Sequence, residues 1–530
     1  MSNVRLLLGD EALAQGALDA GLSGCYAYPG TPSTEIMEYV QAAPERRTRT
    51  IHADWSANEK TAMEEALGMS YAGKRAMVCM KHVGLNVAAD GFINAAITGI
   101  SGGLAVVVAD DPSMHSSQNE QDSRFYAKFA LVPCLEPSSQ QEAYEMARHA
   151  LAFSEEMQVP VMVRITTRLA HSRANIRLAE PQPENPLHLP ETPHRFVLLP
   201  AIARQNYAAL VKKQELFQAR SDASPFNSYT DGPDHELGIV AAGIGLNYLR
   251  ESFPHGKCPH PVLKVGQYPW PRPGLRRLLA ECERVLVLED GAPFIEEALH
   301  GALGLSDRIR GRLTGDLPRT GELTPECVAR ALGRNPRPTP AVHHLVRPRP
   351  PRLCTGCPHA DTYKVLQEVL RDVGKGHVFS DIGCYTLGAL PPFEAINSCV
   401  DMGASISMAK GAVDAGLQPA VAVIGDSTFT HSGMTPLLDA VWEKTRITVI
   451  ILDNGTTGMT GGQTSLATGR LEQIVTGLGV EPAHLRVIIP LPKNHAENVG
   501  ILRAEIFGHH GVSVVIARRE CIQTLRHRKG

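Results

Sequence analysis

The fold is decided by residues 421–463, which read VAVIGDSTFTHSGMTPLLDAVWEKTRITVIILDNGTTGMTGGQ. The stretch opens with a short apolar run, VAVI, which is typical of a buried strand. Gly-Asp-Ser then leads into a predicted helix, whose apolar residues recur at helical spacing: Leu437, Leu438, Val441 and Trp442. A second apolar run at 447–452 ends at Asp-Asn-Gly. The stretch therefore predicts a β-α-β unit with a polar residue at the carboxyl end of each strand.

The two polar strand ends predict a site for a metal ion and a phosphate group. In parallel α/β sheets, ligands bind at the carboxyl ends of the strands, and a helix N-terminus attracts phosphate. Mg²⁺ takes oxygen ligands in an octahedron and often shares them with substrate phosphates. Asp426 offers a carboxylate oxygen, Asn454 an amide oxygen, and the backbone near Thr456 a carbonyl oxygen. We therefore predict these three residues as Mg²⁺ ligands.

The order of these elements is also that of enzymes that use thiamine diphosphate (ThDP). Alone, Gly-Asp is a common helix cap and Asn-Gly a common turn. The fuller wording, GDSTF…HSG…LDN-TT-MTGGQ, resembles the ThDP domain of the large (alpha) subunits of indolepyruvate:ferredoxin oxidoreductases, within the 2-oxoacid:ferredoxin oxidoreductase superfamily. The resemblance implies a catalytic His431 and a set of cofactor-binding residues: Gly403, Gly425, Asp426, Ser427, Asn454 and Thr456.

Length, charge balance and cysteine content limit the classes of protein to which the chain can belong. The 530 residues leave room for three domains. Lys and Arg (52) nearly balance Asp and Glu (55), so we expect neither a nucleic acid nor a membrane as partner. The apolar run near the N-terminus is too short for a signal peptide or a membrane span, so we expect a cytoplasmic protein. Eleven cysteines in such a chain do not suggest a disulfide framework.

The first segment, residues 1–190, is predicted to be a second ThDP domain, the one that binds the pyrimidine ring. Predicted strands alternate with predicted helices, which implies a parallel sheet with helices on both faces: strands 24–28, 76–80 and 104–109, helices 56–71 and 85–98. Four stretches resemble the first domain of the same family: YPGTPSTE, NEK, MKHVGLNVAAD and ADDPSMHSSQNEQDSR.

ThDP chemistry needs a carboxylic acid that hydrogen-bonds the aminopyrimidine ring, in surroundings of low dielectric that keep the acid protonated. The resemblance puts Glu59 on the catalytic Glu of the family, and Thr31 on the threonine beside the 2-oxoacid carboxylate. The alternative for Glu59 is a surface residue paired with Lys60 or Lys74. Arg124 is the candidate partner of the substrate carboxylate, because its guanidinium fork suits a bidentate pair. Further polar residues in these loops are weaker candidates, since such positions often hold caps: Lys81, His82, Asn86, His115 and Gln118.

Two more domains are expected. Residues 191–345 combine a linker with strands at 237–242, 262–265 and 285–288, and resemble a transketolase C-terminal-like domain, which is usually architectural. The proline-rich stretch 335–351 is semi-rigid and marks a boundary. Residues 346–530 form the diphosphate-binding ThDP domain. The predicted fold class is α/β, with two doubly wound parallel sheets of ThDP domains flanking the middle domain.

The last domain opens with a C-x-x-C motif, which binds zinc or an iron–sulfur cluster or forms a redox pair. If zinc bound His359 together with the two cysteines, three ligands very close in sequence would have to form part of one tetrahedron. The superfamily resemblance favours a 4Fe–4S cluster, with four cysteines as ligands: Cys354, Cys357, Cys384 and Cys521. Cys399 is the alternative fourth ligand.

The resemblance implies ThDP-dependent oxidative decarboxylation of 2-oxoacids, arylpyruvates such as indolepyruvate among them, to acyl-coenzyme A. Electrons would pass through the cluster to ferredoxin, and a smaller beta subunit is implied, in a dimer or heterotetramer. Large subunits of this family typically carry a ferredoxin-like tail with two C-x-x-C-x-x-C-x-x-x-C-P runs, and the sequence contains no such run. We therefore expect electrons to leave through another subunit, ferredoxin or a different acceptor.

Two alternatives stay open from the sequence. One is a ThDP-dependent 2-oxoacid decarboxylase without oxidation, and the other is a non-catalytic scaffold subunit that binds ThDP. The sequence also leaves open whether one ThDP site uses one chain or two chains of a dimer.

Overall fold

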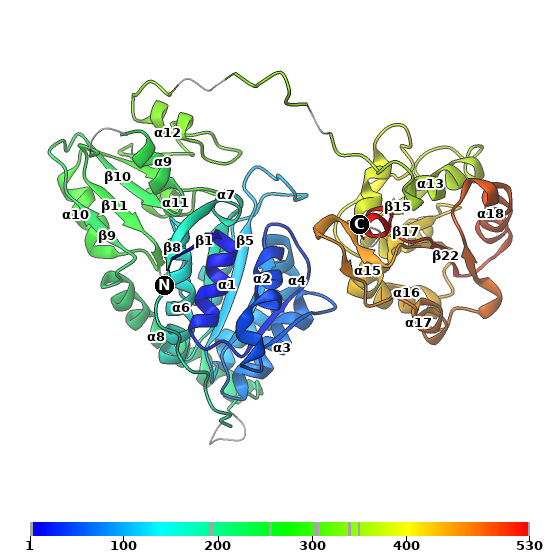
Figure 1. Ribbon diagram of the computed structural model, residues 1–530, viewed down its shortest axis with the longest axis horizontal. Helices are drawn as coiled ribbons and strands as arrows, with labels where there is room; N and C mark the ends of the chain where they lie inside the picture. Colours follow the sequence, from blue (N-terminus) through cyan, green and yellow to red (C-terminus); the bar gives the residue numbers. More distant parts are fainter. Residues whose placement is uncertain are drawn as a thin grey trace. The chain divides into compact units, whose positions relative to one another are not determined.

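The computed structural model describes residues 4–189, 195–253, 257–301, 307–337, 341–347 and 350–527 (Figure 1). The chain divides into two compact units, Met1–Pro340 and Ala341–Gly530. Both contain largely parallel sheets covered by helices, so the predicted α/β fold class is confirmed.

The first unit is built on a seven-stranded sheet of order β12-β6-β7-β5-β4-β2-β3. Its strands are β2 (Gly24–Ala27), β3 (His52–Trp55), β4 (Ala76–Lys81), β5 (Leu104–Asp110), β6 (Cys134–Leu135), β7 (Val161–Thr166) and β12 (Gln267–Tyr268). All pairs are parallel except β12 with β6. The strands predicted at 24–28, 76–80 and 104–109 are confirmed to within a residue at each end. Their carboxyl ends share one edge of the sheet.

Helices cover both faces of this sheet. Helices α1 (Gly9–Asp19), α2 (Thr34–Ala42) and α6 (Gln140–Met157) pack together. Helices α3 (Glu59–Tyr71) and α4 (His82–Thr98) pack against each other, and α8 (Pro200–Asp222) packs against α4. Short helices α5 (Arg124–Ala130) and α7 (Thr167–Ala170) follow β5 and β7, and β1 (Val4–Leu8) pairs antiparallel with β8 (Arg173–Arg177).

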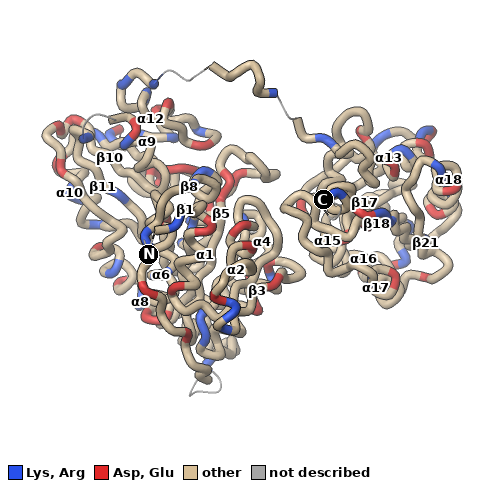
Figure 2. The backbone as a smooth tube through the Cα atoms, viewed as in Figure 1, with Lys and Arg blue, Asp and Glu red and all other residues tan. Residues whose placement is uncertain are grey.

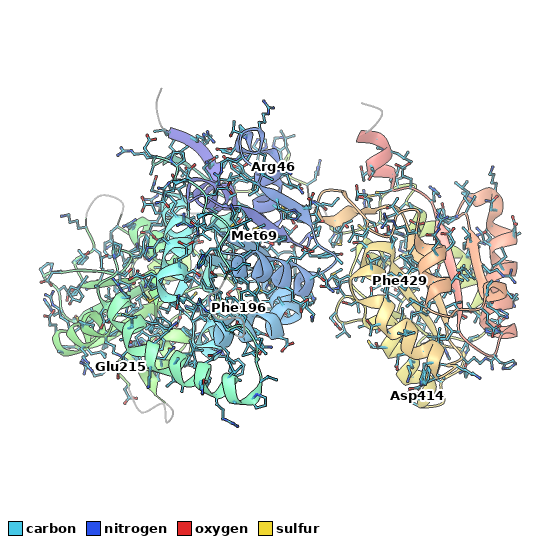
Figure 3. The ribbon with its side chains drawn as sticks, turned by 90° about the horizontal axis from the view of Figure 1, so that it is seen from below. Arg46, Met69, Phe196, Glu215, Asp414 and Phe429 are labelled. Atoms are coloured by element: carbon cyan, nitrogen blue, oxygen red, sulfur yellow. The ribbon has the colours of Figure 1, made fainter. Side chains whose placement is uncertain are left out.

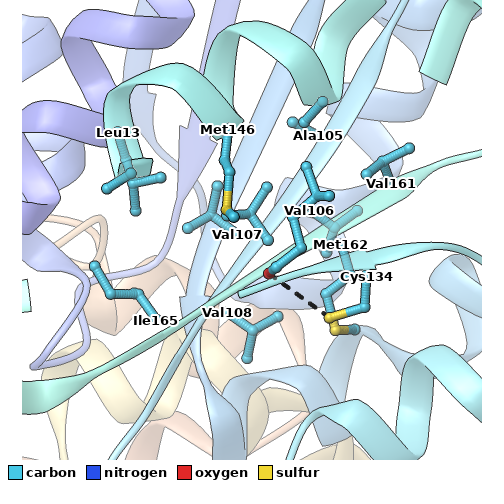
Figure 4. Close-up of a cluster of buried hydrophobic side chains, with 14 of the residues drawn as sticks. Leu13, Ala105, Val106, Val107, Val108, Cys134, Met146, Val161, Met162 and Ile165 are labelled. Carbon is cyan, nitrogen blue, oxygen red and sulfur yellow. Dashed lines mark hydrogen bonds between the residues drawn. The ribbon is translucent and has the colours of Figure 1, made fainter. Parts of the chain in front are cut away.

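The core of the first unit is one cluster of buried apolar side chains that includes the strands of both sheets and the helices packed on them. Figure 4 shows Val106, Val107 and Val108 of β5 beside Met162 of β7, with Leu13 of α1 among the packed side chains; all five are buried. The dashed line in Figure 4 is the contact of a cysteine thiol with a backbone carbonyl, 3.8 Å long. Burying such branched apolar side chains stabilises each by about 1.5–3 kcal/mol, which makes this sheet a rigid support for the residues at its edge.

A second sheet in the first unit comes from the middle of the chain, with order β14-β13-β10-β11-β9. Its strands are β9 (Ser228–Thr230), β10 (Leu237–Ala242), β11 (Val262–Val265), β13 (Arg284–Leu288) and β14 (Ile309–Arg310), with only β9 antiparallel. Around it lie α9 (Gly245–Glu251), α10 (Arg272–Glu281), α11 (Phe294–His300) and α12 (Pro325–Ala331). The predicted strands at 237–242, 262–265 and 285–288 are confirmed. The boundaries of the three predicted domains stay a prediction.

The second unit holds a six-stranded parallel sheet of order β16-β15-β17-β18-β22-β21. The strands are β15 (Val378–Ser380), β16 (Ser398–Cys399), β17 (Val421–Gly425), β18 (Thr448–Asp453), β21 (Leu485–Ile488) and β22 (Ser513–Arg518). Helix α13 (Pro358–Val369) packs with α18 (His495–Arg503), and α14 (Ala404–Asp414) with α16 (Met434–Trp442). The smaller elements are α17 (Leu471–Gly477), α19 (Ile522–His527) and the β19–β20 hairpin (Thr456–Thr457, Gln463–Thr464).

The helix predicted after Gly425 is present but interrupted. It starts as α15 (Asp426–Thr428), passes through a π-helical turn (Phe429–Gly433) and continues as α16. Phe429, labelled in Figure 3, is fully buried. The expected apolar stripe is only partly buried, because Leu438 and Trp442 are 51% and 85% exposed. Single π-helical turns occur often at functional sites.

Charges are spread over the surface of both units. Figure 2 shows Lys and Arg interspersed with Asp and Glu along each of them. Among the described residues, no helix is both long and apolar enough to cross a membrane.

Candidate cofactor, cluster and substrate sites

The second unit brings the two predicted Mg²⁺ side chains to neighbouring strand ends. Asp426 follows β17 and Asn454 follows β18, and these strands pair in parallel. Asp426 is 2% exposed, and its Oδ2 atom has no hydrogen-bond partner among the described residues. Burial, and next the charge of Asp453, raise the pKa of Asp426 to about 7. A buried carboxylate oxygen without a partner is costly, and a cation beside it would remove that cost. The residues therefore fit a Mg²⁺ site.

The loop after β18 folds back onto the same strand end. The Oδ1 atom of Asn454 accepts a hydrogen bond from the backbone N–H of Thr456 at 3.0 Å. Thr456 is buried, and its hydroxyl donates to the carbonyl of Gln463 across the hairpin. Thr457 donates to the Ser427 hydroxyl at 3.1 Å. The predicted residues Ser427, Asn454 and Thr456 therefore belong to one connected group beside Asp426.

Of the three remaining predicted residues, Gly425 ends β17, His431 lies in the π-helical turn, and Gly403 packs against that turn. His431 is 4% exposed, and its Nδ1 atom lies 2.6 Å from the hydroxyl of Ser432. Gly403 precedes α14 with a φ of +90°, and a Cβ atom added there would lie 2.6 Å from the Cβ of Ser432. Glycine thus allows the 403 turn to approach the π-helical turn closely, as the backbone conformation also requires.

Sequence reasoning missed Asp381, which stabilises the same region. Its carboxylate follows β15 and accepts hydrogen bonds from the Ser405 hydroxyl at 2.6 Å and from the Tyr385 hydroxyl. Burial raises the pKa of Asp381 to about 7. An acidic residue after a strand, in the run SDIGC, was the available signal. Asp381 holds the start of α14, and with it the turn at Gly403.

The structure brings the four predicted cluster cysteines together. Cys354 and Cys357 share a tight turn before α13, with the Cys357 N–H donating to the Cys354 carbonyl at 3.0 Å. Burial, and next the nearby Cys357, Cys521 and Cys354, raise the pKa of the Cys384 thiol to about 12. The backbone N–H of Cys521 donates to the carbonyl of Asn454 at 3.2 Å, which ties this cysteine to the Mg²⁺ site.

The alternatives for the cysteines fit less well. The Cys399 thiol instead contacts the carbonyl of Asp381 at 3.7 Å and the hydroxyl of Thr386 at 3.9 Å. Among the described residues, no three of the cysteines or His359 have ligand atoms within 4.8 Å of one another, as one zinc ion would require. A four-iron cluster is wider than a single ion, so its cysteine ligands lie farther apart than the ligands of one zinc. The Nε2 atom of His359 lies 3.2 Å from the Asn454 amide, and burial lowers the pKa of His359 to about 4.

In the first unit, Glu59 lies inside the protein. It starts α3, whose N-terminus is capped by Asn58 through the N–H of Thr61. Glu59 is 5% exposed, and a Cβ atom on Gly84 would lie 2.5 Å from its Oε1 atom, so the carboxyl packs against the first turn of α4. The surface alternative is not observed, because Lys60 pairs with Glu64 and Lys74 with Glu184. Glu59 is thus buried at the start of α3 rather than exposed at the surface.

Thr31 and Lys81 meet at the same edge of the sheet. The Lys81 ammonium donates to the carbonyl of Ser116 at 2.9 Å, and the Ser116 hydroxyl donates to the carbonyl of Thr31 at 3.1 Å. Burial lowers the pKa of Lys81 to about 8, against the opposing charges of Asp111 and Glu59. The structure therefore joins Thr31, Lys81 and Glu59 in one region. Lys81 was only one of several polar candidates in the sequence.

Arg124 does not have the geometry predicted for it. It is 1% exposed, and all five of its guanidinium N–H groups donate within the chain. The acceptors are Asp122, Glu289, the Tyr268 hydroxyl and the Ala292 carbonyl. No donor is left for a substrate carboxylate, so Arg124 links α5 to the middle of the chain instead. His115 is likewise engaged, 3.2 Å from Glu322.

Comparisons with known proteins agree with this geometry. The family profile for "Pyruvate flavodoxin/ferredoxin oxidoreductase, thiamine diP-bdg" matches residues 15–222. The profile for "Thiamine pyrophosphate enzyme, C-terminal TPP binding domain" matches residues 381–515. Among solved structures, the fold is similar to a 2-oxoglutarate:ferredoxin oxidoreductase from Magnetococcus marinus, with a TM-score of 0.51 and 19% identity, over 63% of this chain and 65% of that one.

Similarity to curated proteins extends over nearly the whole chain. Indolepyruvate oxidoreductase subunit IorA of Archaeoglobus fulgidus is 39% identical, over 97% of this chain and 86% of that protein. The IorA subunit of Methanothermobacter thermautotrophicus is 38% identical over the same shares. The 2-oxoglutarate synthase subunit KorA of the latter organism is 27% identical over 34% of this chain. The resemblance inferred from the motifs is confirmed: the chain belongs to the IorA family of ThDP-dependent oxidoreductases, which carry out oxidative decarboxylation of 2-oxoacids.

Proposed function

We propose that this chain is the catalytic, ThDP-binding subunit of an oxidoreductase for arylpyruvates such as indolepyruvate, with acyl-coenzyme A as product. The observation that carries the proposal is the buried Asp426 oxygen without a partner, beside Asn454 at the neighbouring strand end. ThDP, when bound, supplies the electron sink without which the bond to CO₂ does not break.

The residues of the second unit have the task of holding the cofactor. Asp426, Asn454 and a backbone carbonyl near Thr456 supply hard oxygen ligands of the kind that Mg²⁺ takes together with a diphosphate. Ser427 is the second residue of α15, and the N–H groups at a helix start favour an anion. Cys354, Cys357, Cys384 and Cys521 are proposed as ligands of a 4Fe–4S cluster, and the bond from Cys521 to Asn454 supports a short path from the Mg²⁺ site to that cluster.

In the first unit, Glu59 is proposed to act on the cofactor, and Thr31 and Lys81 to bind the substrate. The buried Glu59 carboxyl would hydrogen-bond the aminopyrimidine ring of bound ThDP. Thr31 and Lys81 take the 2-oxoacid carboxylate, with Lys81 in the role first predicted for Arg124. A lysine with a pKa of about 8 is still charged at neutral pH, so it attracts a carboxylate.

Partners and location are part of the proposal. We propose a smaller beta subunit in a dimer or heterotetramer, ferredoxin as electron acceptor, and a cytoplasmic location. His431 is proposed as a further catalytic residue, because it is buried in the π-helical turn, five residues after Asp426.

The experiment that tests the function is anaerobic turnover of a panel of 2-oxoacids. The chain, with and without its smaller subunit, is incubated with coenzyme A and an oxidised viologen dye, and dye reduction is followed. We expect the highest kcat/KM with arylpyruvates. CO₂ release without dye reduction would identify the non-oxidative decarboxylase, and equal activity after Glu59→Gln would identify a scaffold subunit.

A further inference from the structure

Three residues outside the sites described above form a compact group in the first unit. Asp10 lies in the first turn of α1, Glu35 in the first turn of α2, and His171 directly after α7. One ligand atom of each lies within 4.8 Å of the other two. The Nε2 atom of His171 and the Oε1 atom of Glu35 are 3.5 Å apart.

Asp10 is the residue that calls for an explanation. It is 0% exposed, and neither of its carboxylate oxygens has a hydrogen-bond partner among the described residues. The Oε2 atom of Glu35 is likewise without a partner there. Buried polar atoms are almost always satisfied, and exceptions often mark an ion or another group that binds. Burial, and then the charges of Glu35 and Glu11, raise the pKa of Asp10 well above its usual value. The group therefore favours a cation or a proton.

A close backbone contact at Gly9 fixes the position of Asp10. A Cβ atom on Gly9 would lie 2.2 Å from the carbonyl oxygen of Leu169, so only glycine lets the start of α1 contact the backbone of α7. That contact brings Asp10 next to His171, which follows the same helix. The approach of three elements from distant parts of the sequence is thus built into the fold.

The donor set suits a transition-metal ion. Ligands held at about 2.0–2.2 Å from one tetrahedral zinc are roughly 3.3–3.6 Å apart, which agrees with the His171–Glu35 separation. One imidazole nitrogen with two carboxylates favours zinc and similar ions over Mg²⁺ or Ca²⁺, which prefer oxygen alone. Three protein ligands leave one position open. The side chains of His171 and Glu35 are each 34% exposed, so an ion can enter.

We propose that Asp10, Glu35 and His171 bind one divalent transition-metal ion, such as Zn²⁺. The ion would tie α1 and the end of α7 to α2. Because α2 begins directly after the turn that carries Thr31, the ion would also hold that turn in place. The three residues act as ligands of a structural site, distinct from the Asp426 site in the other unit.

The test is a count of bound zinc in the full-length chain. Wild type, Asp10→Asn, His171→Gln and a control, His52→Gln, are loaded with Mg²⁺–ThDP, dialysed against micromolar Zn²⁺ and analysed by mass spectrometry of the metal. His52 is a suitable control because it is a half-exposed histidine beside an aspartate, 3.8 Å away. Zinc bound by the cysteines is common to all four proteins and cancels in the comparison.

We expect wild type and His52→Gln to hold one more zinc per chain than Asp10→Asn and His171→Gln. Zn²⁺ should also raise the melting temperature of wild type and His52→Gln more than that of Asp10→Asn and His171→Gln. Equal zinc content in all four proteins would overturn the proposal. A rise in melting temperature of Asp10→Asn without any difference in zinc would show that Asp10 merely holds a proton. If Asp10→Asn does not fold, His171→Gln, at a more exposed position, decides the question.

Discussion

At the scale of single residues, Asp426 is the most informative position. Its pKa of about 7 lies above that of an unfolded aspartate, so its contribution to stability is full at low pH and is lost as pH rises toward 7. Asp381 behaves in the same way. We expect the protein without Mg²⁺–ThDP to unfold at a higher temperature at pH 5 than at pH 8, with a smaller difference in Asp426→Asn. Calorimetry at both pH values measures this.

The same substitution should abolish cofactor binding. Asp426→Asn replaces an anionic ligand by a neutral one of the same shape, and we expect at least a roughly 100-fold loss of Mg²⁺–ThDP affinity, since even outer-shell changes at metal sites cost 10–100-fold. Titration with Mg²⁺–ThDP by calorimetry gives the value. A matched control is Asp439→Asn on the exposed face of α16, which should bind as wild type. Unchanged affinity in Asp426→Asn would refute its role as a ligand.

The charge of Lys81 leads to a separate prediction about the pH dependence of KM. As pH rises through about 8, the ammonium loses its proton, and the attraction for a 2-oxoacid carboxylate is lost. We expect KM for the 2-oxoacid to rise above pH 8 while kcat changes little, and Lys81→Met to raise KM by about tenfold or more at pH 7. Lys81→Arg keeps its charge, so its KM should depend less on pH. A change in kcat alone would argue for a role in chemistry instead.

Residue types in the sequence indicated the site but not every role within it. Asp426 and Asn454 were predicted because each stands at a strand end that local patterns reveal, whereas Glu59 was predicted from the family resemblance. The sequence did not reveal that Arg124 lies in a buried ion network, because the fork that suits a substrate carboxylate suits a buried carboxylate equally well. Its partner Glu289 lies far along the chain, and only the folded structure brings the two together.

At the scale of elements, the cysteine-bearing loops carry the clearest prediction. The turn at Cys354 and Cys357, the loop at Cys384 and the segment before α19 converge in the second unit. Cys384→Ser should lose most of the iron and acid-labile sulfide of the anaerobically purified protein, whereas Cys399→Ser should keep it, because the Cys399 thiol contacts Asp381 and Thr386 instead. Iron loss in Cys399→Ser with retention in Cys384→Ser would reverse the assignment.

Elements with simple patterns were predicted well. Apolar runs of four to seven residues located the central strands of all three large sheets, since a parallel strand is buried on both faces. The π-helical turn at Phe429–Gly433 was not predictable, because no local propensity distinguishes it from an α-helix. The exposed Trp442 shows that apolar residues at helical spacing do not always face the core.

At the scale of the whole molecule, a buried ion network joins the two sheets of the first unit. Arg124 and Arg164 pair with Asp110, Asp122, Glu136 and Glu289, all of them buried. Removing one partner of such a network typically costs about 3–5 kcal/mol, because charges remain buried without compensation. We expect Arg124→Met to lower the denaturant midpoint of the first unit while the KM for the 2-oxoacid of the folded enzyme stays near the wild-type value.

A raised KM with unchanged stability would instead restore Arg124 as the substrate partner.

The network illustrates the limit of sequence reasoning at this scale. Alternating strands and helices predicted an α/β chain. The pairing of β12 with β6 was not predictable, because no local pattern in the sequence indicates it. This pairing inserts the middle of the chain into the first sheet.

We propose that a ThDP-dependent reaction involving Glu59 delivers electrons to an iron–sulfur cluster held by the cysteines of this chain. The most direct measurement is the visible absorption of the iron–sulfur cluster after one addition of indolepyruvate to the anaerobic Mg²⁺–ThDP-loaded enzyme. We predict bleaching of that absorption in wild type, and a rate at least about 100-fold lower in Glu59→Gln, within the range for loss of a general acid. Release of CO₂ without bleaching, or equal bleaching in Glu59→Gln, would contradict the account.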